Sequence, residues 1–220
     1  MGDGAVRYAD YTLAGFSDAL ASDAPVPGGG SASAVAASLA ASLLVMVARL
    51  SIGRPKYAAY GASHERAIAA GEAARRRFLE LADEDATAYA AFGAARKLPR
   101  DTPEEEAVRG SAIRLAARGA AEVPLEVVRN CHALVQLIES LTGRSNVNAA
   151  SDLDVAALLA QAAARGAGAN VIINLPSVED PRYAGTLLAD LEGRLHEIES
   201  IVAGIHSRVR SGSLRAAEGP

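Results

Sequence analysis

The chain has 220 residues, of which half are hydrophobic and 22% are charged, a composition typical of a globular protein. This length suits one large domain with a core of its own, and we expect residues 1–220 to form a single domain. The net charge of −4 argues against nucleic acid as a partner, because nucleic-acid-binding domains are usually basic. The lone cysteine, Cys131, excludes an internal disulfide and a multi-cysteine zinc site, and we expect a cytoplasmic protein.

Two segments near the N-terminus bear on whether the chain meets a membrane. Residues 1–10 have neither the basic start nor the apolar core of a signal peptide, so we expect no leader there. Residues 32–50 are as long as a membrane span, but serine recurs through them, Arg49 closes them and alanine dominates. These features favour a buried helix in a crowded core, and we expect no membrane partner.

Glycine and proline punctuate the chain, and the apolar residues between them recur at helical spacings of three and four. No alternation typical of a strand occurs; residues 170–175 are the only stretch that could form one, and we favour a helix there too. The expected helices are a short one capped by Thr12, then residues 32–50, 57–95 and 103–141, one capped by Ser151 that runs to about residue 175, and residues 181–210.

Local signals support these helices. Residues 102–105, Thr-Pro-Glu-Glu, read as a cap, a first-turn proline and dipole-matching acids, and Pro124 predicts a kink further along the same helix. The tail after Arg210 is expected to fray. Abundant alanine and glycine let helices approach closely, which predicts an all-α, up-and-down bundle of five to six helices. The last helix carries a near-heptad stripe typical of a bundle or a dimer seam: Leu187, Leu191, Leu195, Ile198, Val202, Ile205 and Val209.

The common catalytic motifs are missing from the sequence. The four histidines show no metal-ligand spacing, and there is no nucleophile elbow, phosphate-binding loop or strand-anchored dinucleotide motif. Cys131 and His132 are neighbours in sequence and therefore point to different faces of a helix, which argues against a catalytic pair. We expect no metal site.

The first segment that could carry chemistry precedes the alanine-rich helix. Gly28, Gly29, Gly30 and Ser31 leave free backbone N–H groups at a helix start, with room for an anion or a carbonyl group to approach. The alternative is a flexible helix start or a close contact with another helix.

The second segment is acidic. Asp85 and Tyr89 are four residues apart and share a helix face, and Lys97 is one of only two lysines in the chain. An acid near a rare lysine could transfer protons. A solvated acidic turn is the simpler interpretation.

Two further segments each carry a pair of asparagines. Amide side chains suit a heterocycle with alternating donors and acceptors, although an amide among apolar residues also needs a partner, which can be backbone. Beside the first pair, a helix cap with its dipole-matching acid accounts for Ser151 and Asp152. The pairs are Asn146 with Asn148, and Asn170 with Asn174.

Together these segments resemble the cyclodeaminase/cyclohydrolase family of one-carbon metabolism, which includes formimidoyltetrahydrofolate cyclodeaminase and a methenyltetrahydrofolate cyclohydrolase. The resemblance keeps one order over roughly residues 10–210; each motif alone is weak, and together they are specific. The motifs are residues 25–31, 46–50, 56–57, Asp85 with 88–89, 95–99, Arg109, 123–125, Asn146, Asn148, 151–152 and 170–175.

The resemblance implies an all-helical homodimer that acts on tetrahydrofolate derivatives. The cyclodeaminase, a lyase, converts 5-formimidoyltetrahydrofolate to 5,10-methenyltetrahydrofolate and ammonia, and is the function we expect. The alternative is the cyclohydrolase, which adds water to the methenyl compound and gives 10-formyltetrahydrofolate. Neither reaction requires a metal or a cofactor beyond the folate substrate, and a separate formiminotransferase is a possible partner.

The resemblance also suggests roles for individual residues. The hypothesis assigns proton transfer to Asp152 or Asp85 with Lys97 as charge partner, pterin contact to the four asparagines, and backbone N–H groups to residues 28–31. Arg49 and Arg109 are candidates for the glutamate tail or for structural pairing. The remaining candidates for substrate binding are Lys56, Tyr57, Tyr89 and Ser151.

One loop departs from the family pattern. Arg144 and Ser145 precede Asn146 where relatives tend to have Gly-Asn, and Asp154 replaces a usual glycine. If this loop shapes the pocket, the substrate preference changes. The same departure leaves open a helical dimer that binds folate without turnover.

Overall fold

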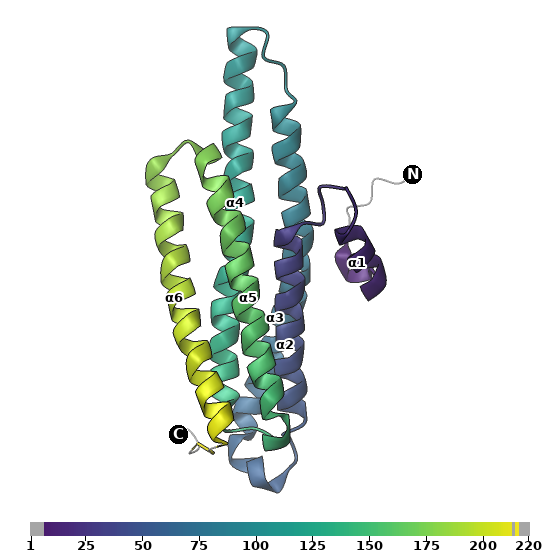
Figure 1. The fold of residues 1–220 in the computed structure, drawn as a ribbon, viewed down its shortest axis with the longest axis vertical. Coiled ribbons are helices and arrows are strands. Elements are labelled where there is room, and N and C mark those ends of the chain that lie inside the picture. The colour runs from purple at the N-terminus through teal and green to yellow at the C-terminus, as the bar shows by residue number, and fades with distance from the viewer. Residues whose placement is uncertain (1–6, 213, 216–220) are drawn as a thin grey trace.

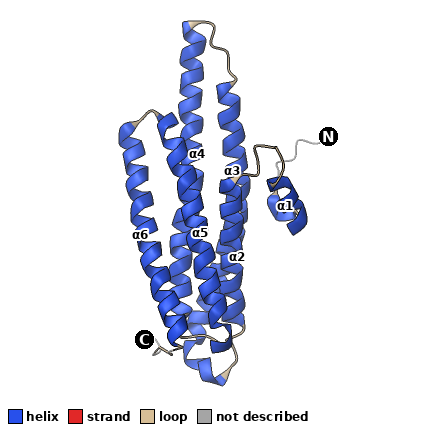
Figure 2. Cartoon of the chain, viewed as in Figure 1, coloured by secondary structure: helices blue, strands red, loops and turns tan. Residues whose placement is uncertain are grey.

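The computed structural model describes residues 7–212 and 214–215. Helices account for nearly all regular structure in this part of the chain, which contains no strand (Figure 2). Short 3₁₀ turns cover Tyr8–Asp10, Pro55–Tyr60, Val147–Ala149 and Leu175–Val178. The α-helices are α1 (Leu13–Leu20), α2 (Gly29–Arg49), α3 (Gly61–Arg96), α4 (Pro103–Leu141), α5 (Ala150–Asn174) and α6 (Pro181–Ser211).

Five helices form an up-and-down bundle, so the predicted fold class is confirmed. Helix α2 packs between α3 and α5, α4 packs between the same two helices on the other side, and α6 covers α4 and α5 (Figure 1). Helix α1 lies beside the bundle, next to α2 and α3 (Figure 1). The hairpin of α3 and α4 extends beyond α5 and α6 (Figure 1).

Small residues set the spacing of the helices. Much of the buried face of α2 is alanine, which lets neighbouring backbones come close. At Gly71 on α3, an added Cβ would lie 2.6 Å from Val45 Cγ2, so α2 and α3 meet where only glycine fits. Larger side chains such as Phe78 fill the remaining core, and Cys131 is buried among them as expected.

Several predicted boundaries are confirmed. Thr12 caps α1 by accepting a hydrogen bond from the Gly15 N–H at 3.0 Å. Thr102 and Glu105 form a complete capping box at the start of α4, which continues through Pro124 to Leu141. The strand-like stretch 170–175 is helical through residue 174.

Two boundary predictions are wrong. Ser151 caps no helix, because α5 begins one residue earlier at Ala150 without a side-chain cap. The Asn146 side chain instead accepts from the Asn148 N–H and caps the short turn before α5. Likewise, α3 begins at Gly61 because Pro55–Tyr60 form a 3₁₀ turn.

Of the tail after Arg210, where fraying is expected, residues 213 and 216–220 lie outside the described residues, and two hydrogen bonds hold Arg215. The Arg215 N–H donates to the Gly143 carbonyl at 2.9 Å, and the Tyr60 hydroxyl donates to the Arg215 carbonyl at 2.5 Å. At the other end, residues 1–6 of the segment where we expect no leader lie outside the described residues.

Two segments are long and apolar enough to cross a membrane by composition alone, namely α2 and residues 147–178. More than half of the most apolar window of α2 is buried inside the protein, at 56%, which is the burial expected of a core helix. Both segments nevertheless leave apolar side chains on the surface, among them Leu39 and Leu158.

Candidate functional site

A cleft of about 360 Å³ at the start of α2 brings together many of the predicted site residues. It is enclosed by the loop before α2, the first residues of that helix, the middle of α3 and the end of α5. Its lining is Pro25, Val26, Gly28, Gly29, Gly30, Asp85, Tyr89, Phe92, Asn170, Ile173 and Asn174.

Gly30 lets the start of α2 approach the Asp85 side chain on α3 closely, and Gly29 lies opposite Asn170 on α5. A Cβ on Gly30 would lie 2.1 Å from Asp85 Oδ1, and one on Gly29 would lie 3.4 Å from Asn170 Nδ2. Gly28 is the N-cap residue, and its carbonyl accepts the first helical bond, from the Ala32 N–H. The N–H groups of the first turn therefore have no partner within α2, and their partial positive charge faces Asp85.

Asp85 is the acid of this cleft. The Ser31 hydroxyl lies 2.9 Å from Asp85 Oδ2 and 3.0 Å from the Ala82 carbonyl. Burial raises the pKa of the Asp85 carboxyl, and the hydrogen bonds from the Ser31 hydroxyl and backbone offset part of that rise. No lysine or arginine lines the cleft among the described residues. Asp85 is thus a carboxyl that exchanges a proton more readily near neutral pH than a solvated one.

The two amides at the end of α5 line the cleft. Asn174 Nδ2 donates to the Ala120 carbonyl on α4 and to the Asn170 carbonyl, both at 2.8 Å. Asn170 Nδ2 donates to the Gly166 carbonyl at 2.9 Å. Because both amide hydrogens of Asn174 are used, its side chain can only accept a hydrogen bond from a ligand.

Tyr89 and Phe92 complete the wall on α3. Tyr89 lies one turn after Asp85, so the predicted shared face is present, and half of its surface is exposed. Aromatic side chains beside amide acceptors suit a flat heterocycle with N–H donors at its edge.

The remaining predicted residues lie elsewhere, and the asparagine loop is at the opposite end of α2. The 21 residues of that helix separate the two ends by about 30 Å. The Asn146 N–H donates to Ser51 Oγ at 2.8 Å and its side chain holds the turn, so in this structure Asn146 shapes the loop. Asp152 is half-buried in the first turn of α5, with Asn148 and Ser151 exposed beside it.

Tyr57 supports the same loop. It is buried, its hydroxyl accepts from the Val147 N–H at 3.0 Å, and the Lys56 ammonium lies 5.6 Å from the centre of its ring. Tyr57 and Lys56 therefore belong to the asparagine end of α2.

Lys97 and Arg109 lie at neither end of α2 but at the tip of the α3–α4 hairpin. Lys97 follows Asp85 by 12 residues along α3, which is about 18 Å. Solvent screens most interaction over that distance, so within one chain the structure does not pair Lys97 with Asp85 as we expected. Arg109 donates from Nε and Nη2 to the Arg96 carbonyl at 3.2 and 3.1 Å, and so caps the end of α3.

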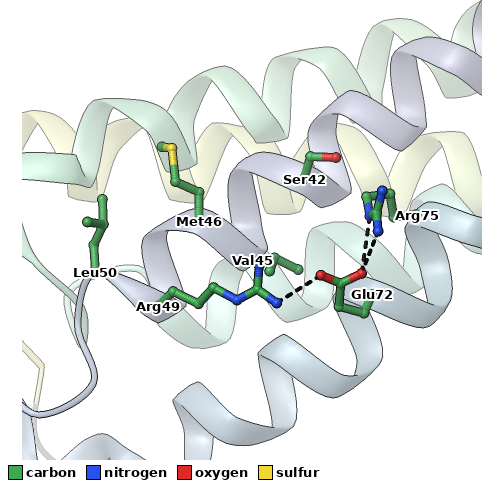
Figure 3. A pocket seen from close by; sticks show the side chains of 7 residues that line it. All are labelled: Ser42, Val45, Met46, Arg49, Leu50, Glu72 and Arg75. Carbon is green, nitrogen blue, oxygen red and sulfur yellow. Dashed lines mark hydrogen bonds and ion pairs between the residues drawn. The ribbon is translucent and has the colours of Figure 1, made fainter.

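Arg49 lines a second cleft, of about 460 Å³, between α2 and α3 (Figure 3). Its guanidinium contacts Glu72 at 3.0 Å, and Arg75 contacts the same carboxylate at 2.8 Å (Figure 3). Arg76 approaches Glu72 at 3.7 Å. The hydrogen bond from Arg75, aided by the charges of all three arginines, holds the pKa of Glu72 below its usual value. Three cations around one anion leave this surface positive.

The residues that depart from the family pattern are used in packing. Arg144 is buried and donates from Nη1 to the Ser140 carbonyl at 3.1 Å, and Asp154 pairs with His206 Nδ1 at 2.9 Å. Both lie near the asparagine end of α2 and away from the Asp85 cleft. The described residues contain no cluster of three or more metal-ligating side chains.

Sequence reasoning missed part of the site. Phe92 follows Asp85 by seven residues and Tyr89 by three, so helical spacing placed it on the same face. Ile173 and Val26 belong to the motifs of residues 170–175 and 25–31 that carry the family resemblance, but neither was given a role of its own. The contact between Ser31 and Asp85 joins residues 54 apart, and no local pattern predicts it.

The sequence is similar to those of several known proteins. The sequence profile described as formiminotransferase-cyclodeaminase matches residues 12–193. The chain is 36% identical over 200 residues to a methenyltetrahydrofolate cyclohydrolase from Methylorubrum extorquens, a match that covers 91% of this chain and 96% of that protein. It is also 36% identical over 209 residues to the formimidoyltransferase-cyclodeaminase of Mus musculus, covering 94% of this chain but 37% of that protein.

A solved structure has the same fold. The formiminotetrahydrofolate cyclodeaminase from Thermotoga maritima superposes with a TM-score of 0.84 at 29% identity, covering 92% of this chain and 98% of that one. The chain thus spans nearly the whole length of this protein and of the bacterial cyclohydrolase, and about a third of the longer mouse relative.

Proposed function

The chain belongs to the formiminotransferase-cyclodeaminase family, and we propose that it is a tetrahydrofolate enzyme that converts 5-formimidoyltetrahydrofolate to 5,10-methenyltetrahydrofolate and ammonia. The observation that carries the proposal is the Asp85 carboxyl, which lies against Gly30 of α2 in a cleft whose other polar side chains are Asn170, Asn174 and Tyr89.

The reaction requires one proton to change place. The folate N10 attacks the formimidoyl carbon, a C–N10 bond forms, and the bond from that carbon to the amidinium nitrogen breaks. N10 loses its proton and the departing nitrogen gains one, so ammonia leaves and the methenyl cation remains. A single carboxylate can take the proton from N10 and return it to the leaving group.

Asp85 suits this proton transfer because its buried environment disfavours the ionised carboxylate. Burial raises its pKa, so the carboxyl holds a proton more readily than a solvated aspartate does. Ser31 can donate to the carboxylate or accept from the carboxylic acid, and so serves either state. No metal or cofactor beyond the folate enters the proposal.

The pterin would lie against Tyr89 and the amides of α5. The Asn174 side-chain oxygen is placed to accept from the amino group or ring N–H of the pterin, and the first-turn N–H groups of α2 to donate to its carbonyl. Because the chain spans about a third of the mouse relative, formimidoyl transfer belongs in this proposal to a separate formiminotransferase.

A second function, methenyltetrahydrofolate cyclohydrolase, is favoured by the match to nearly the whole length of the bacterial cyclohydrolase. Water would attack the methenyl carbon and lose one proton to Asp85, which would pass it to N5 as the bond from N5 to that carbon breaks. The remaining hydroxyl proton would leave to solvent as the formyl carbonyl forms on N10. The product, 10-formyltetrahydrofolate, forms in the same cleft from the product of the first reaction.

One assay decides between the two functions. The purified protein receives 5-formimidoyltetrahydrofolate or 5,10-methenyltetrahydrofolate, and the methenyl absorbance is followed against buffer controls at several pH values. Enzyme-dependent gain of absorbance with ammonia release supports the cyclodeaminase, and enzyme-dependent loss from the second substrate supports the cyclohydrolase. If folded protein binds folate and changes neither substrate, both proposals are wrong and a non-catalytic folate-binding dimer remains.

We further propose that two copies assemble through α2 and α5, which pack against each other and both expose apolar side chains. Isolated surface leucines are ordinary, but neighbouring helices that both carry them indicate a contact surface. The exposed residues are Leu39 and Met46 on α2, Leu50 just after it, and Val155, Leu158 and Ile172 on α5.

Such a dimer would combine the two polar ends of α2. If a two-fold axis ran perpendicular to α2 through its middle, the two copies of α2 would be antiparallel. The Asp85 end of one copy would then lie next to the Asp152 end of the other. In this arrangement Asp152 completes the site in trans, and Arg49 joins it from the same end as a candidate for the glutamate tail.

Mixing two inactive variants tests this shared site. Asp85→Asn and Asp152→Asn are purified separately and then allowed to exchange subunits in equal amounts. Half of the resulting dimers are mixed, and each mixed dimer has one intact site, so about a quarter of the wild-type activity should return. Full activity of Asp152→Asn alone, or no recovery although mixed dimers form, would exclude the shared site.

A further inference from the structure

The Asp85 cleft lacks a cation for the charged end of a folate. Tetrahydrofolates carry a glutamate tail, which is a dicarboxylate, and no lysine or arginine lines the cleft among the described residues. A carboxylate that leaves water needs a cation or several N–H donors. A bound folate would therefore have to extend its tail out of the cleft, and a cation beside the exit could hold it there.

Helix α3 continues the wall of the cleft towards such a cation. Asp85, Tyr89 and Phe92 line the cleft, and Arg96 is the last residue of the helix. The four residues follow one another at spacings of four, three and four, so they form one row along one face of α3. This row leads from the cleft towards the tip of the α3–α4 hairpin, which extends beyond α5 and α6 (Figure 1).

The Arg96 guanidinium lies beside the aromatic wall of the cleft. Its Cζ is 5.9 Å from the centre of the Phe92 ring, which is within the range of a cation–π contact. Helical side chains lean towards the N-terminus of their helix, and here that is the direction of the cleft. Arg109 donates to the Arg96 carbonyl at 3.2 and 3.1 Å, and these two bonds fix the backbone that carries the guanidinium.

The N–H groups of Arg96 are available to a ligand. Arg96 is exposed, and among the described residues no carboxylate pairs with its guanidinium. A contact with an aromatic ring leaves a guanidinium able to bind a carboxylate through two parallel hydrogen bonds. Arg49 differs in this respect, because it already contacts Glu72 at 3.0 Å and a ligand would have to compete with that carboxylate.

The spacing along α3 suits the dimensions of a folate. The Arg96 guanidinium lies beside Phe92, which follows Asp85 by seven residues, or about 10 Å along the helix. In a folate, the benzoyl ring and its amide bond place the α-carboxylate of the glutamate about 10 Å from N10 at ordinary bond lengths. A substrate with N10 at Asp85 can therefore reach Arg96 with its tail.

We propose that Arg96 binds the α-carboxylate of the folate glutamate, with the benzoyl ring against Phe92 and N10 near Asp85. This inference rests on the proposed function and adds to it a residue that selects substrates with a charged tail. Arg96 takes no part in proton transfer. Its loss should therefore weaken substrate binding and leave the chemical step unchanged.

The kinetic test uses two forms of whichever folate substrate the wild type converts. One has the free glutamate, and in the other both carboxylates of the glutamate are neutral amides. In Arg96→Met the KM for the free glutamate form should rise about tenfold, with kcat unchanged, because charge-assisted hydrogen bonds are lost. The KM for the diamide should stay the same. Arg96→Lys should recover part of the loss, because it restores the charge without the two parallel bonds.

Arg100→Met is the matched control. Arg100 is exposed and follows the end of α3 by four residues, so this variant removes the same charge from the hairpin tip but not from the row. Its KM values should stay within about twofold of the wild type, because solvent screens a charge that does not contact the ligand. Equal rises in the Arg96 and Arg100 variants would overturn the proposal. So would an equal rise for both substrate forms in Arg96→Met, or a rise in Arg49→Met without one in Arg96→Met.

A binding measurement does not depend on activity. Calorimetry with 5-formyltetrahydrofolate and its diamide should show that the wild type prefers the free glutamate form about tenfold and that Arg96→Met binds the two forms equally. If the wild type shows this preference and turns over neither substrate, the proposed function is wrong and the tail site holds. If the wild type is active and Arg96→Met keeps the preference, the tail site is wrong. A wild type that binds neither form would overturn both.

Discussion

The polar groups at the two ends of α2 are held in different ways. At its start, three glycines bring the backbone against a half-buried carboxyl, and Ser31 and the α5 amides surround that carboxyl. Beyond its other end, the Asn146 N–H donates to Ser51 and the Asn146 side chain accepts from the Asn148 N–H. Asn148 and Ser151 are exposed there, and Asp152 is half-buried.

The Asp85 end of α2 is a preformed site, whereas the asparagine end is a surface that could complete the site of another copy. Backbone and buried partners fix the Asp85 end within a single chain, and groups held in this way need little reorganisation during a reaction. The asparagine end offers exposed side chains on a firmly built loop. Matched variants at the two ends of α2 should therefore differ in how much activity or stability they lose.

The largest effect should come from the carboxyl itself. Asp85→Asn removes the proton carrier and should lower kcat by at least about a hundredfold while the fold is retained. The matched control is Glu84→Gln, the adjacent acid, which pairs with Arg77 on the outside of α3. Its activity should stay near that of the wild type in the same methenyl assay.

A small loss in Asp85→Asn, or equal losses in the two variants, would remove Asp85 from the chemistry. The preformed end of α2 would then be a packing feature, and Asp152 would become the first candidate for the proton carrier.

The next effect concerns the glycine beneath the carboxyl. In Gly30→Ala the new methyl group would lie 2.1 Å from Asp85 Oδ1, so the carboxylate must move by about 1 Å. A shift of that size costs roughly tenfold to a hundredfold in turnover. The helix should tolerate the change within about 1 kcal/mol, because alanine favours helices and a side-chain end can rotate away.

Gly61→Ala is the control, at the start of α3 near the asparagine end. Nothing lies within 4 Å of its added methyl group, so activity and stability should hardly change. Kinetics and thermal unfolding of both variants check the pair. A Gly30→Ala variant that stays fully active would show that the position of Asp85 is not critical.

A smaller effect should follow from the amides. Asn174→Ala removes both bonds that its Nδ2 makes, one of which ties α5 to α4, and should reduce the free energy of unfolding by about 1 kcal/mol. Asn148→Ala lies on an exposed surface and should change stability by less than about 0.5 kcal/mol. Denaturant titration measures both, and equal losses would contradict the distinction between the two ends.

The smallest effect is a dependence of stability on pH. Because the pKa of Asp85 is raised in the folded protein, its ionisation costs stability as pH rises through that pKa, and the cost is absent below the pKa of the unfolded chain. Asp85→Asn should therefore melt above the wild type at pH 7 and lose this advantage near pH 4. Thermal unfolding at the two pH values checks the sign; an advantage that grows on acidification would contradict it.

Sequence patterns predicted what depends on neighbours along the chain. The capping box at Thr102, the helical stretch that ends at Asn174 and the shared face of Asp85 and Tyr89 are all local, and all are present. Ser151 shows the limit, because the loop before α5 follows from the bond between the Asn146 N–H and Ser51, 95 residues away.

The candidate site was likewise predictable only in part from the sequence. Residue types and the family resemblance identified candidate residues at both ends of α2. They could not show that the two ends lie about 30 Å apart. Within one chain Lys97 lies about 18 Å from Asp85 along α3, so its role as charge partner of Asp152 or Asp85 stays a prediction.

Cys131 gives this protein an experimental advantage. It is the only thiol in the chain, it is fully buried on α4, and burial raises its pKa far above the usual value. Thiol-directed labels react with the exposed thiolate, so they should leave Cys131 untouched. A cysteine introduced at either end of α2 would then be the sole point of attachment. Spectroscopic probes placed there could measure, without further engineering, how far each end lies from its counterpart in an assembled pair.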